Sequence, residues 1–427
     1  MRCAALLACA WACAAATPTG GGCRDRWLQP FGSSSIWNTA IGSGAVFQHA
    51  QIYTGFNASW GCALRVSAAN RRVSCRAPGV NGSSPEGPCL AAGCCFVSQP
   101  RPQCFIPAGG PPDHGVHADQ DILLRAALDD PVTPFKDRAW RGGGECVEAG
   151  EVKGSLPFPA DWTGECEDNN NAFALLLGDN ETLLQSQPLY RAAPGAAIMA
   201  QWPPSHPEYA GFMAGWNMSI LSADGAAGGH GGSFLSSIGG TLRVGELSAG
   251  LIPHALKLEL YGHDFYWSGL RGPPDCYTWP AIACDGYGNS SGWNGYNGLL
   301  PWVRPGALVA VPSSLAGALA ARMVTPPART ILQALVSYGA YLVDDTAGDS
   351  LAICAEPAAI VELRESWNIS INITQSALPS SPGATGDFFR DIVLIAQNLH
   401  AVSNNAPGAV GGGGVPLQPP APPICGA

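Results

Sequence analysis

The segment that begins at His114 carries the side chains best suited to chemistry. It reads HGVHADQDILLR, and a strand there places His117, Asp119 and Asp121 on one face because side chains alternate along a strand. An imidazole and two carboxylates in a row suit a divalent metal or a hydroxyl-rich ligand, and His114 can join them from the preceding turn. The alternative is a solvated strand face with ordinary polar residues.

A second polar segment follows, DNNNAFALLLGDNETLLQSQPLYR. Gln185 and Gln187 share one face of an expected strand here, with Arg191 close behind. Amide and guanidinium groups pair with sugar hydroxyls and carboxylates, so these residues join Asp119 and Asp121 as substrate-binding candidates. The alternative is that the amides only form turns and edge-strand contacts.

The third segment is GGHGGSFLSSIGGTLRVGEL. His230 lies between glycine pairs, where the backbone can approach a ligand closely. If Leu242 and Val244 face one way on a strand, Arg243 faces the other and is free for an anion. Tight turns between strands are the alternative for this block.

In the following segment, IPHALKLEL, His254 lies on the same side of the expected strand as the three leucines, which indicates a core histidine.

Two reactions on polysaccharides fit these groups. A lyase needs a base beside the proton on the uronate carbon and a cation or donor on the carboxylate; His117 or His230 would be the base, and Arg243 or Arg191 the neutralising group. A glycoside hydrolase needs two carboxylates across the scissile bond, and Asp119 and Asp121 are too close in sequence to form an obvious pair. The expected cofactor is at most a divalent metal, with His114, His117, Asp119 and Asp121 as candidate ligands.

Two functions without catalysis use the same residues. In one, a glycan-binding protein recognises extracellular polysaccharide or glycoprotein through this polar face. In the other, a structural glycoprotein of an extracellular matrix or cell wall uses disulfides and glycans for stability. The chain has no H-E-x-x-H, Walker or G-x-G-x-x-G motif, which argues against that class of zinc protease and against common nucleotide-binding folds.

Composition and charge further limit the classes of protein to which this chain can belong. The chain has 427 residues, 46% of them hydrophobic, so it can bury a sizeable core. Lys and Arg number 22 against 32 Asp and Glu, for a formal net charge of −10, and no basic cluster occurs. A protein that binds nucleic acid through phosphates needs clustered positive charge, so nucleic acid is not an expected partner.

The N-terminus predicts export. Residues 1–16 have the charged start, the short apolar stretch and the A-x-A ending of a secretory signal peptide. No later stretch is long and apolar enough to predict a membrane span, so we expect a secreted protein of the extracellular space or cell wall. Seven N-x-S/T sequons fit a glycoprotein: Asn57, Asn81, Asn180, Asn217, Asn289, Asn368 and Asn372.

Six cysteines crowd into one stretch with little aliphatic content, which predicts a small module held by disulfides. They are Cys62, Cys75, Cys89, Cys94, Cys95 and Cys104. Arg72 precedes the second of them by three residues, a Gly-Cys-Cys-Phe block spans 93–96, and Cys104-Phe105 closes the stretch.

This stretch, residues 57–106, resembles a trefoil (P-type) domain. The resemblance implies the disulfides Cys62–Cys95, Cys75–Cys94 and Cys89–Cys104. Sugar-binding trefoils have an acidic residue after the Cys-Cys-aromatic block and a Trp before the last cysteine; this chain has Val97 and Gln103 there. The resemblance therefore implies the scaffold more strongly than sugar binding by the module.

The remaining chain must position the polar segments, and it is predicted to be mainly β. We expect a β-sandwich-like body over 24–56 and 107–405, with the trefoil module inserted, and a flexible Gly/Pro-rich tail over 406–427. Strands are predicted at 172–177, 182–190, 241–247 and 254–261. Late helices are predicted from Thr325-Pro326 onward and over 386–400.

Seven cysteines remain outside the signal peptide and the module. Cys146 with Cys166, and Cys276 with Cys284, are close enough to close local loops. Cys23, Cys354 and Cys425 are left, so one thiol is unpaired or intermolecular. The blocks WNTAI, SSIGGTLRVGEL, IPHALKLEL and LVSYGAYLVDD also resemble a group of secreted bacterial and algal proteins, which supports one continuous body and names no reaction.

Overall fold

The computed structural model describes most of the body and a few strands of the cysteine-rich module. The described residues are 22–52, 72–74, 95–97, 103–107, 115–137, 152–164, 171–200, 218–222, 224–271, 275–290, 295–346, 350–371 and 386–426. The predicted signal peptide, His114, and the pair Cys146 and Cys166 lie outside them.

The strands are short and the helices come late, as predicted. The strands are β1 (Phe47–His49), β2 (Arg72–Ser74), β3 (Cys95–Val97), β4 (Gln103–Pro107), β5 (Gly115–Gln120), β6 (Ile122–Arg125), β7 (Val132–Asp137), β8 (Val152–Pro157), β9 (Phe173–Leu176), β10 (Thr182–Ser186), β11 (Leu189–Tyr190), β12 (Ile198–Ala200), β13 (Met218–Ser219), β14 (Leu256–Leu260), β15 (Leu308–Ala310), β16 (Ala340–Asp345), β17 (Ser350–Ala355) and β18 (His400–Val402). The helices are α3 (Glu246–Ala249), α4 (Gly262–Phe265), α5 (Ser313–Ala320), α6 (Pro326–Ser337), α7 (Pro357–Trp367) and α8 (Gly386–Ala396), with 3₁₀ turns η3 (Gly269–Arg271) and η4 (Val410–Gly412).

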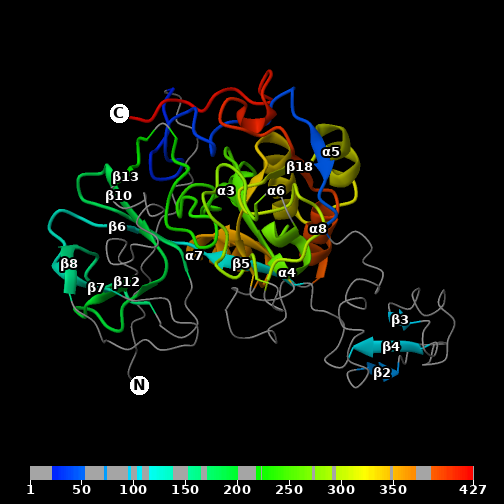
Figure 1. Cartoon of the computed structure of the whole chain (residues 1–427). Coiled ribbons are helices and arrows are strands. Elements are labelled where there is room, and N and C mark those ends of the chain that lie inside the picture. The colour runs from blue at the N-terminus through cyan, green and yellow to red at the C-terminus, as the bar shows by residue number, and fades with distance from the viewer. Residues whose placement is uncertain are drawn as a thin grey trace, which may run out of the picture.

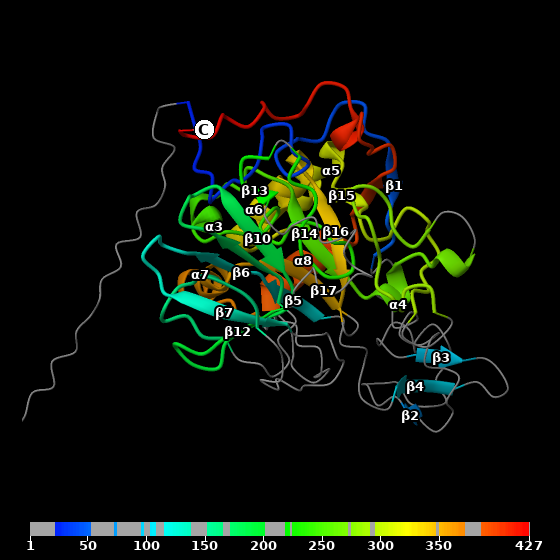
Figure 2. The same cartoon turned by 60° about the vertical axis from the view of Figure 1, so that its left-hand side comes forward.

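A seven-stranded mixed sheet forms the centre, in the order β1-β18-β15-β16-β14-β17-β5 (Figures 1 and 2). Strand β14 pairs parallel with β16 and antiparallel with β17, and β17 pairs parallel with β5. Strands far apart in sequence are thus neighbours at both edges of the sheet, β1 with β18 and β5 with β17. This arrangement brings the segment after His114 beside the C-terminal third of the chain.

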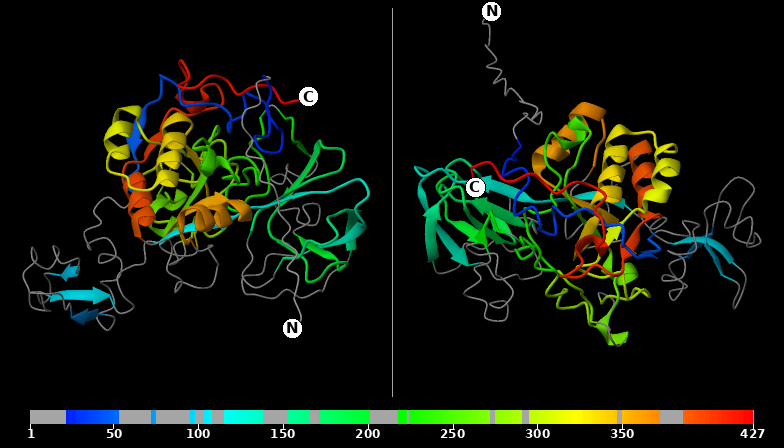
Figure 3. Two further views of the ribbon diagram at one scale, coloured as in Figure 1. Left: turned by 180° about the vertical axis from the view of Figure 1, so that it is seen from behind. Right: turned by 90° about the horizontal axis from the view of Figure 1, so that it is seen from above.

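One face of this sheet packs against helices (Figure 3). Leu256 and Leu258 of β14 and Ile353 of β17 share a buried cluster with residues of α6 and α8, among them Leu335 and Phe388. Helix α6 begins at Pro326, where a fixed φ suits the first turn. Thr325 precedes this helix, and its hydroxyl donates to Asp391 instead of accepting a hydrogen bond from the first turn of α6.

The other face is covered by β-structure. Tyr341 and Val343 of β16 pack with Trp37 and with Leu176 and Leu183 of the sheet β13-β10-β9-β6. The opposite side of that sheet shares a third apolar cluster with the sheet β11-β12-β7-β8. The body is therefore mainly β with a sandwich-like pair of four-stranded sheets, which confirms the predicted class.

Within residues 57–106 and just beyond, the described backbone forms a small antiparallel sheet in the order β2-β4-β3. Cys95 pairs with Phe105, and Phe96 with Cys104, across β3 and β4. The side chains of this module, and with them its predicted disulfides, lie outside the described residues.

The C-terminal segment, predicted to be a Gly/Pro-rich tail with Cys425 as its one attachment, is bound to the body at several further points. Backbone hydrogen bonds join Gly42 and Ser43 to Gly411 and Val415, and a disulfide joins Cys23 to Cys425. The close approach requires glycine at Gly42 in the N-terminal part of the body, because a Cβ there would lie 2.0 Å from the carbonyl oxygen of Gly413. Cys276 pairs with Cys284 as predicted, and Cys354 is the unpaired thiol among the described cysteines.

The predicted strands at 172–177, 182–190 and 254–261 correspond to β9, to β10 with β11, and to β14. The strand predicted at 241–247 is wrong: Leu242 forms only an isolated bridge with Ala355, and α3 begins at Glu246. The left-handed φ of 87° at Gly245 ends the extended conformation.

In the described part of the chain, no helix has the length and apolar character to cross a membrane.

Candidate functional site

A cluster of polar side chains lies on the face of the seven-stranded sheet opposite the helices. On β14, Leu256, Leu258 and Leu260 face the helices, so Lys257 and Glu259 face the other way, where both are buried. The same alternation directs Asp119 of β5 and Cys354 of β17 to this face, while Ala118 and Ile353 pack toward the helices.

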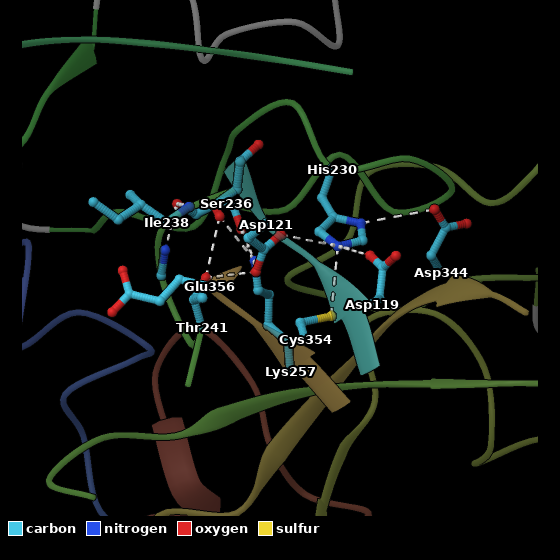
Figure 4. Close-up of polar contacts among 12 residues, drawn as sticks. Asp119, Asp121, His230, Ser236, Ile238, Thr241, Lys257, Asp344, Cys354 and Glu356 are labelled. Atoms are coloured by element: carbon cyan, nitrogen blue, oxygen red, sulfur yellow. Dashed lines mark hydrogen bonds and ion pairs between the residues drawn. The ribbon is translucent and has the colours of Figure 1, made fainter. Parts of the chain in front are cut away.

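His230 enters the cluster from a loop that lies over this face (Figure 4). The loop is held by two amides: the side-chain oxygen of Gln187 accepts from the backbone N–H of Gly231 at 2.5 Å, and that of Gln185 accepts from the backbone N–H of Ser237 at 2.7 Å. A Cβ on Gly231 would lie 2.5 Å from Oδ2 of Asp344, so glycine is required for this approach. The imidazole is fully buried as a result. We name the polar side chains around it the polar centre; they are Asp119, Asp121, His230, Lys257, Glu259, Asp344 and Cys354.

Four polar atoms surround Nε2 of His230 at similar distances. Sγ of Cys354 lies 3.6 Å away, Oδ2 of Asp119 and Oε1 of Glu259 3.7 Å, and Oδ1 of Asp121 3.8 Å. On the other side of the ring, Oδ2 of Asp344 lies 3.7 Å from Nδ1. The separations between nitrogen and oxygen exceed the usual hydrogen-bond range of about 2.7–3.2 Å.

Lys257 and Asp121 form a fully buried ion pair beside the imidazole. Nζ of Lys257 lies 2.9 Å from Oδ2 of Asp121 and donates to the carbonyl oxygens of Ser236 and Ser237 at 3.1 and 3.0 Å. The hydroxyl of Thr241 donates to the same Asp121 oxygen at 2.6 Å. All three ammonium protons thus have acceptors, which is the arrangement that makes a buried lysine tolerable.

Burial is the largest cause of the pKa shifts of the ionisable side chains around His230. It raises the pKa of Asp121 to about 6, although the Lys257 charge acts in the opposite direction. Burial, followed by the charges of Asp119 and Asp344, raises the pKa of Glu259 well above its ordinary value. Burial and then the Lys257 charge lower the pKa of His230, and burial raises the pKa of the Cys354 thiol. Among protein groups alone, His230, Glu259 and Cys354 therefore favour their neutral forms.

The polar centre continues into carboxyl groups bound by tyrosines. The hydroxyl of Tyr296 donates to Oδ2 of Asp285 at 2.5 Å, and that of Tyr287 donates to Oδ2 of Asp345 at 3.0 Å. The backbone N–H of Asp345 donates to Oδ1 of Asp344 at 2.8 Å. Burial raises the pKa of both Asp285 and Asp345.

Asp119, Asp121 and His230 were predicted from two separate segments, and the structure brings them together. The predicted face at Asp119 and Asp121 is buried rather than exposed because the His230 loop covers it. His117 lies two residues before Asp119 on the same face of the same strand and is half-buried. We name His117, together with the slightly exposed side chains of Asp119 and Asp344, the rim of the polar centre.

Both arginines lie elsewhere, which corrects the prediction that they are free for an anion. Nε of Arg243 lies 3.1 Å from Oε2 of Glu356, and its guanidinium stacks 5.2 Å from the ring centroid of Trp27. Arg191 donates to backbone carbonyls, including those of Pro159 and Ala196. Gln185 and Gln187 hold the loop with their carbonyl groups, so they position His230 rather than face a ligand directly.

Sequence reasoning missed Lys257, Glu259, Asp344 and Cys354 as members of the polar centre. A signal existed in LKLEL, where a lysine and a glutamate alternate with leucines that are all buried. A second signal was the odd number of cysteines, seven, outside the predicted signal peptide and the module, which left one thiol unpaired or intermolecular.

His254, predicted to be a core histidine, is buried, and it provides a pH-dependent contribution to stability. Burial by itself lowers the pKa of His254, but the Glu246 carboxylate at 2.8 Å and the carbonyl of Ala255 outweigh it, so the pKa is raised above 6.5. A raised folded-state pKa means that this stabilisation is complete below pH 6.5 and is lost as the pH rises through the folded-state pKa.

We therefore expect the free energy of unfolding of the protein to exceed that of His254→Gln most below pH 6.5, with the difference shrinking at higher pH. Urea unfolding across this range measures it. Glu246→Gln is the matched variant, since it removes the carboxylate that raises the pKa. A difference that stays constant or grows as the pH rises would contradict the assignment.

The residues that could hold a metal ion are Asp119, His230, Glu259 and Cys354, whose ligand atoms all lie within 4.8 Å of one another. Fold and site together define a mainly β protein with a buried polar centre between a helix-backed sheet and a β-sandwich. Searches with protein-family models, against curated proteins and against solved structures found no match for the chain.

Proposed function

We propose that the protein is secreted and acts on extracellular carbohydrate, and that substrate meets the rim of the polar centre. The observation that carries this proposal is the convergence of the GVHADQD and GGHGG segments at one place, with the amides of Gln185 and Gln187 from the second polar segment holding the His230 loop there. Scattered polar segments would instead have favoured a purely structural role.

Covalent and surface features support secretion. The disulfides Cys23–Cys425 and Cys276–Cys284 are typical of an oxidising compartment. Three of the sequon asparagines lie in the described part of the chain, and Asn180, Asn289 and Asn368 are all exposed there. A glycan on these side chains would extend into solvent.

The rim offers groups for either polysaccharide reaction. Asp119 and Asp344 keep 11% and 10% of their side chains exposed and lie on opposite sides of the His230 ring. His117 is the half-buried imidazole of the same face and is the proposed base of an elimination. Two separated carboxyl groups are also what a hydrolase requires, so the pair Asp119 and Asp344 replaces the pair Asp119 and Asp121 considered from sequence.

The test is product formation from a panel of neutral and uronate polysaccharides incubated with the purified secreted protein. New reducing ends with ultraviolet absorbance identify a lyase, and reducing ends alone identify a hydrolase. We expect His117→Ala to lower turnover by about 100-fold or more. His400→Ala is the control, because this imidazole lies on β18 near the opposite edge of the same sheet and should leave turnover unchanged. Full activity in His117→Ala would show that the rim is not the reacting site.

A second candidate is a non-catalytic structural glycoprotein. The observation that favours it is the near-complete burial of His230, Lys257, Glu259 and Cys354, which suits a cluster that supports the fold. A structural role predicts that no polysaccharide in the panel is cleaved in the same assay. Affinity for a polymer without product would instead identify a binding protein.

A further inference from the structure

The four donor atoms in the polar centre have the spacing of ligands around a common ion. In a tetrahedral site with bonds of about 2.0–2.3 Å, neighbouring ligand atoms are about 3.3–3.8 Å apart. From Nε2 of His230, the Cys354 sulfur lies at 3.6 Å and the Asp119 and Glu259 oxygens at 3.7 Å. The Cys354 sulfur also lies 3.7 Å from Oε1 of Glu259.

The balance of charge at this place also calls for a cation. The described side chains around His230 bring the carboxyl groups of Asp119, Asp121, Glu259 and Asp344 together with one ammonium group, that of Lys257. Like charges so close together are costly when buried. Oδ1 of Asp121 is fully buried, accepts no hydrogen bond and points into the cluster, 3.8 Å from the imidazole.

We infer that Asp119, His230, Glu259 and Cys354 bind a divalent transition metal, with zinc as the expected ion. One thiolate, one imidazole and two carboxylates are all ligands that Zn²⁺ accepts. Ca²⁺ and Mg²⁺ prefer all-oxygen sites, so the sulfur argues against them. Binding converts the Cys354 thiol to a thiolate, and its proton leaves to solvent.

The surroundings fit a metal-bound histidine. Such a histidine presents one ring nitrogen to the ion and has its other nitrogen beside a carboxylate or carbonyl group, which fixes the ring. His230 directs Nε2 at the other three ligands, and Asp344 lies on the Nδ1 side. Asp344 would then be a positioning residue.

Four protein ligands make a closed site, which is typical of structural rather than catalytic zinc. They come from β5, the 224–240 loop, β14 and β17, so one ion would fasten the loop to three strands. The inference also gives Cys354 a role as the thiol left without a disulfide partner. A fold-supporting ion is compatible with an elimination at His117, a binding protein or a structural glycoprotein, whereas a hydrolase that used Asp119 would need this carboxylate free of the ion.

The experiment measures metal directly. The full chain is secreted from a eukaryotic host in zinc-containing medium, purified without a polyhistidine tag, and analysed by elemental mass spectrometry. We expect about one zinc per chain. Replacement by Co²⁺ is expected to give the intense near-ultraviolet band of a thiolate bound to cobalt, and chelation is expected to lower the melting temperature.

Cys354→Ser and Glu259→Gln test the ligands, and each is expected to weaken zinc binding by at least about tenfold. His254→Gln is the matched control, a buried histidine outside the cluster, and should retain one zinc. The cobalt band of the unaltered protein identifies a thiolate ligand even if a variant fails to fold.

Two results would overturn the inference. One is a chain that contains no zinc and takes up none of the added Zn²⁺ or Co²⁺. The other is bound metal that persists in Cys354→Ser without change in affinity. Metal content can fail this test while polysaccharide cleavage persists, and the reverse also holds, so the two proposals are separable.

Discussion

Lys257→Met is expected to destabilise the protein by about 3–5 kcal/mol, the typical cost of leaving a buried charge without its partner. The ammonium group is the ion-pair partner of Asp121 and also donates to the carbonyls of Ser236 and Ser237, all of them buried. Methionine fills similar volume but donates nothing. The variant therefore removes the charge partner of Asp121 and one hydrogen bond to each of two buried carbonyl oxygens, while the packing is largely kept.

Urea unfolding of the secreted chain measures this effect. Lys153→Met is the control, because Lys153 is exposed on β8 and its replacement should change stability by about 0.5 kcal/mol or less. Adding Asp121→Asn to Lys257→Met should recover part of the loss, since the uncompensated charge is removed. A loss below about 1 kcal/mol for Lys257→Met would mean that the ion pair does not support the folded state.

Trp37→Ala is the second large effect, with an expected loss of about 3–5 kcal/mol in the free energy of unfolding. The indole is 1% exposed, donates from Nε1 to the carbonyl of Gly225 at 2.7 Å, and packs edge-on against Tyr341. It also lies under the turn that precedes Thr241: a Cβ on Gly240 would be 2.4 Å from its ring.

This position couples Trp37 to the polar centre. The residues before that turn supply the carbonyls that hold Lys257, so loss of the indole should loosen them. Hydrogen exchange at the backbone N–H of Gly239, which donates to the Ser236 hydroxyl, reports this loosening. Trp37→Phe retains most of the ring volume and should lose less stability than Trp37→Ala. Equal losses in the two variants would show that the indole hydrogen bond, and not the packing, carries the effect.

Both predictions concern groups that local pattern alone could not connect. Trp37, Lys257 and the 224–240 loop are far apart in sequence, and each of them reads as an ordinary member of its own segment. They act together because β14, which carries Lys257, pairs in the central sheet with the distant strand β16, whose Tyr341 packs against Trp37. A double-mutant cycle between Trp37→Phe and Lys257→Met would measure this coupling directly.

By itself, the sequence determined the local features. A short continuous apolar run predicted β9, alternating or β-rich segments predicted β10 and β14, and helical spacing predicted α6 and α8. Seven cysteines lie outside the predicted signal peptide and the module, so one thiol had to be unpaired or intermolecular, and the glycine pairs around His230 indicated close backbone approach. Only the tertiary structure decided which thiol is unpaired, that Arg243 and Arg191 bind internally, and that Gln185 and Gln187 hold a loop. It also placed Glu259, Cys354 and Asp119 around one imidazole, since the order β14-β17-β5 is set by long-range pairing that no local pattern encodes.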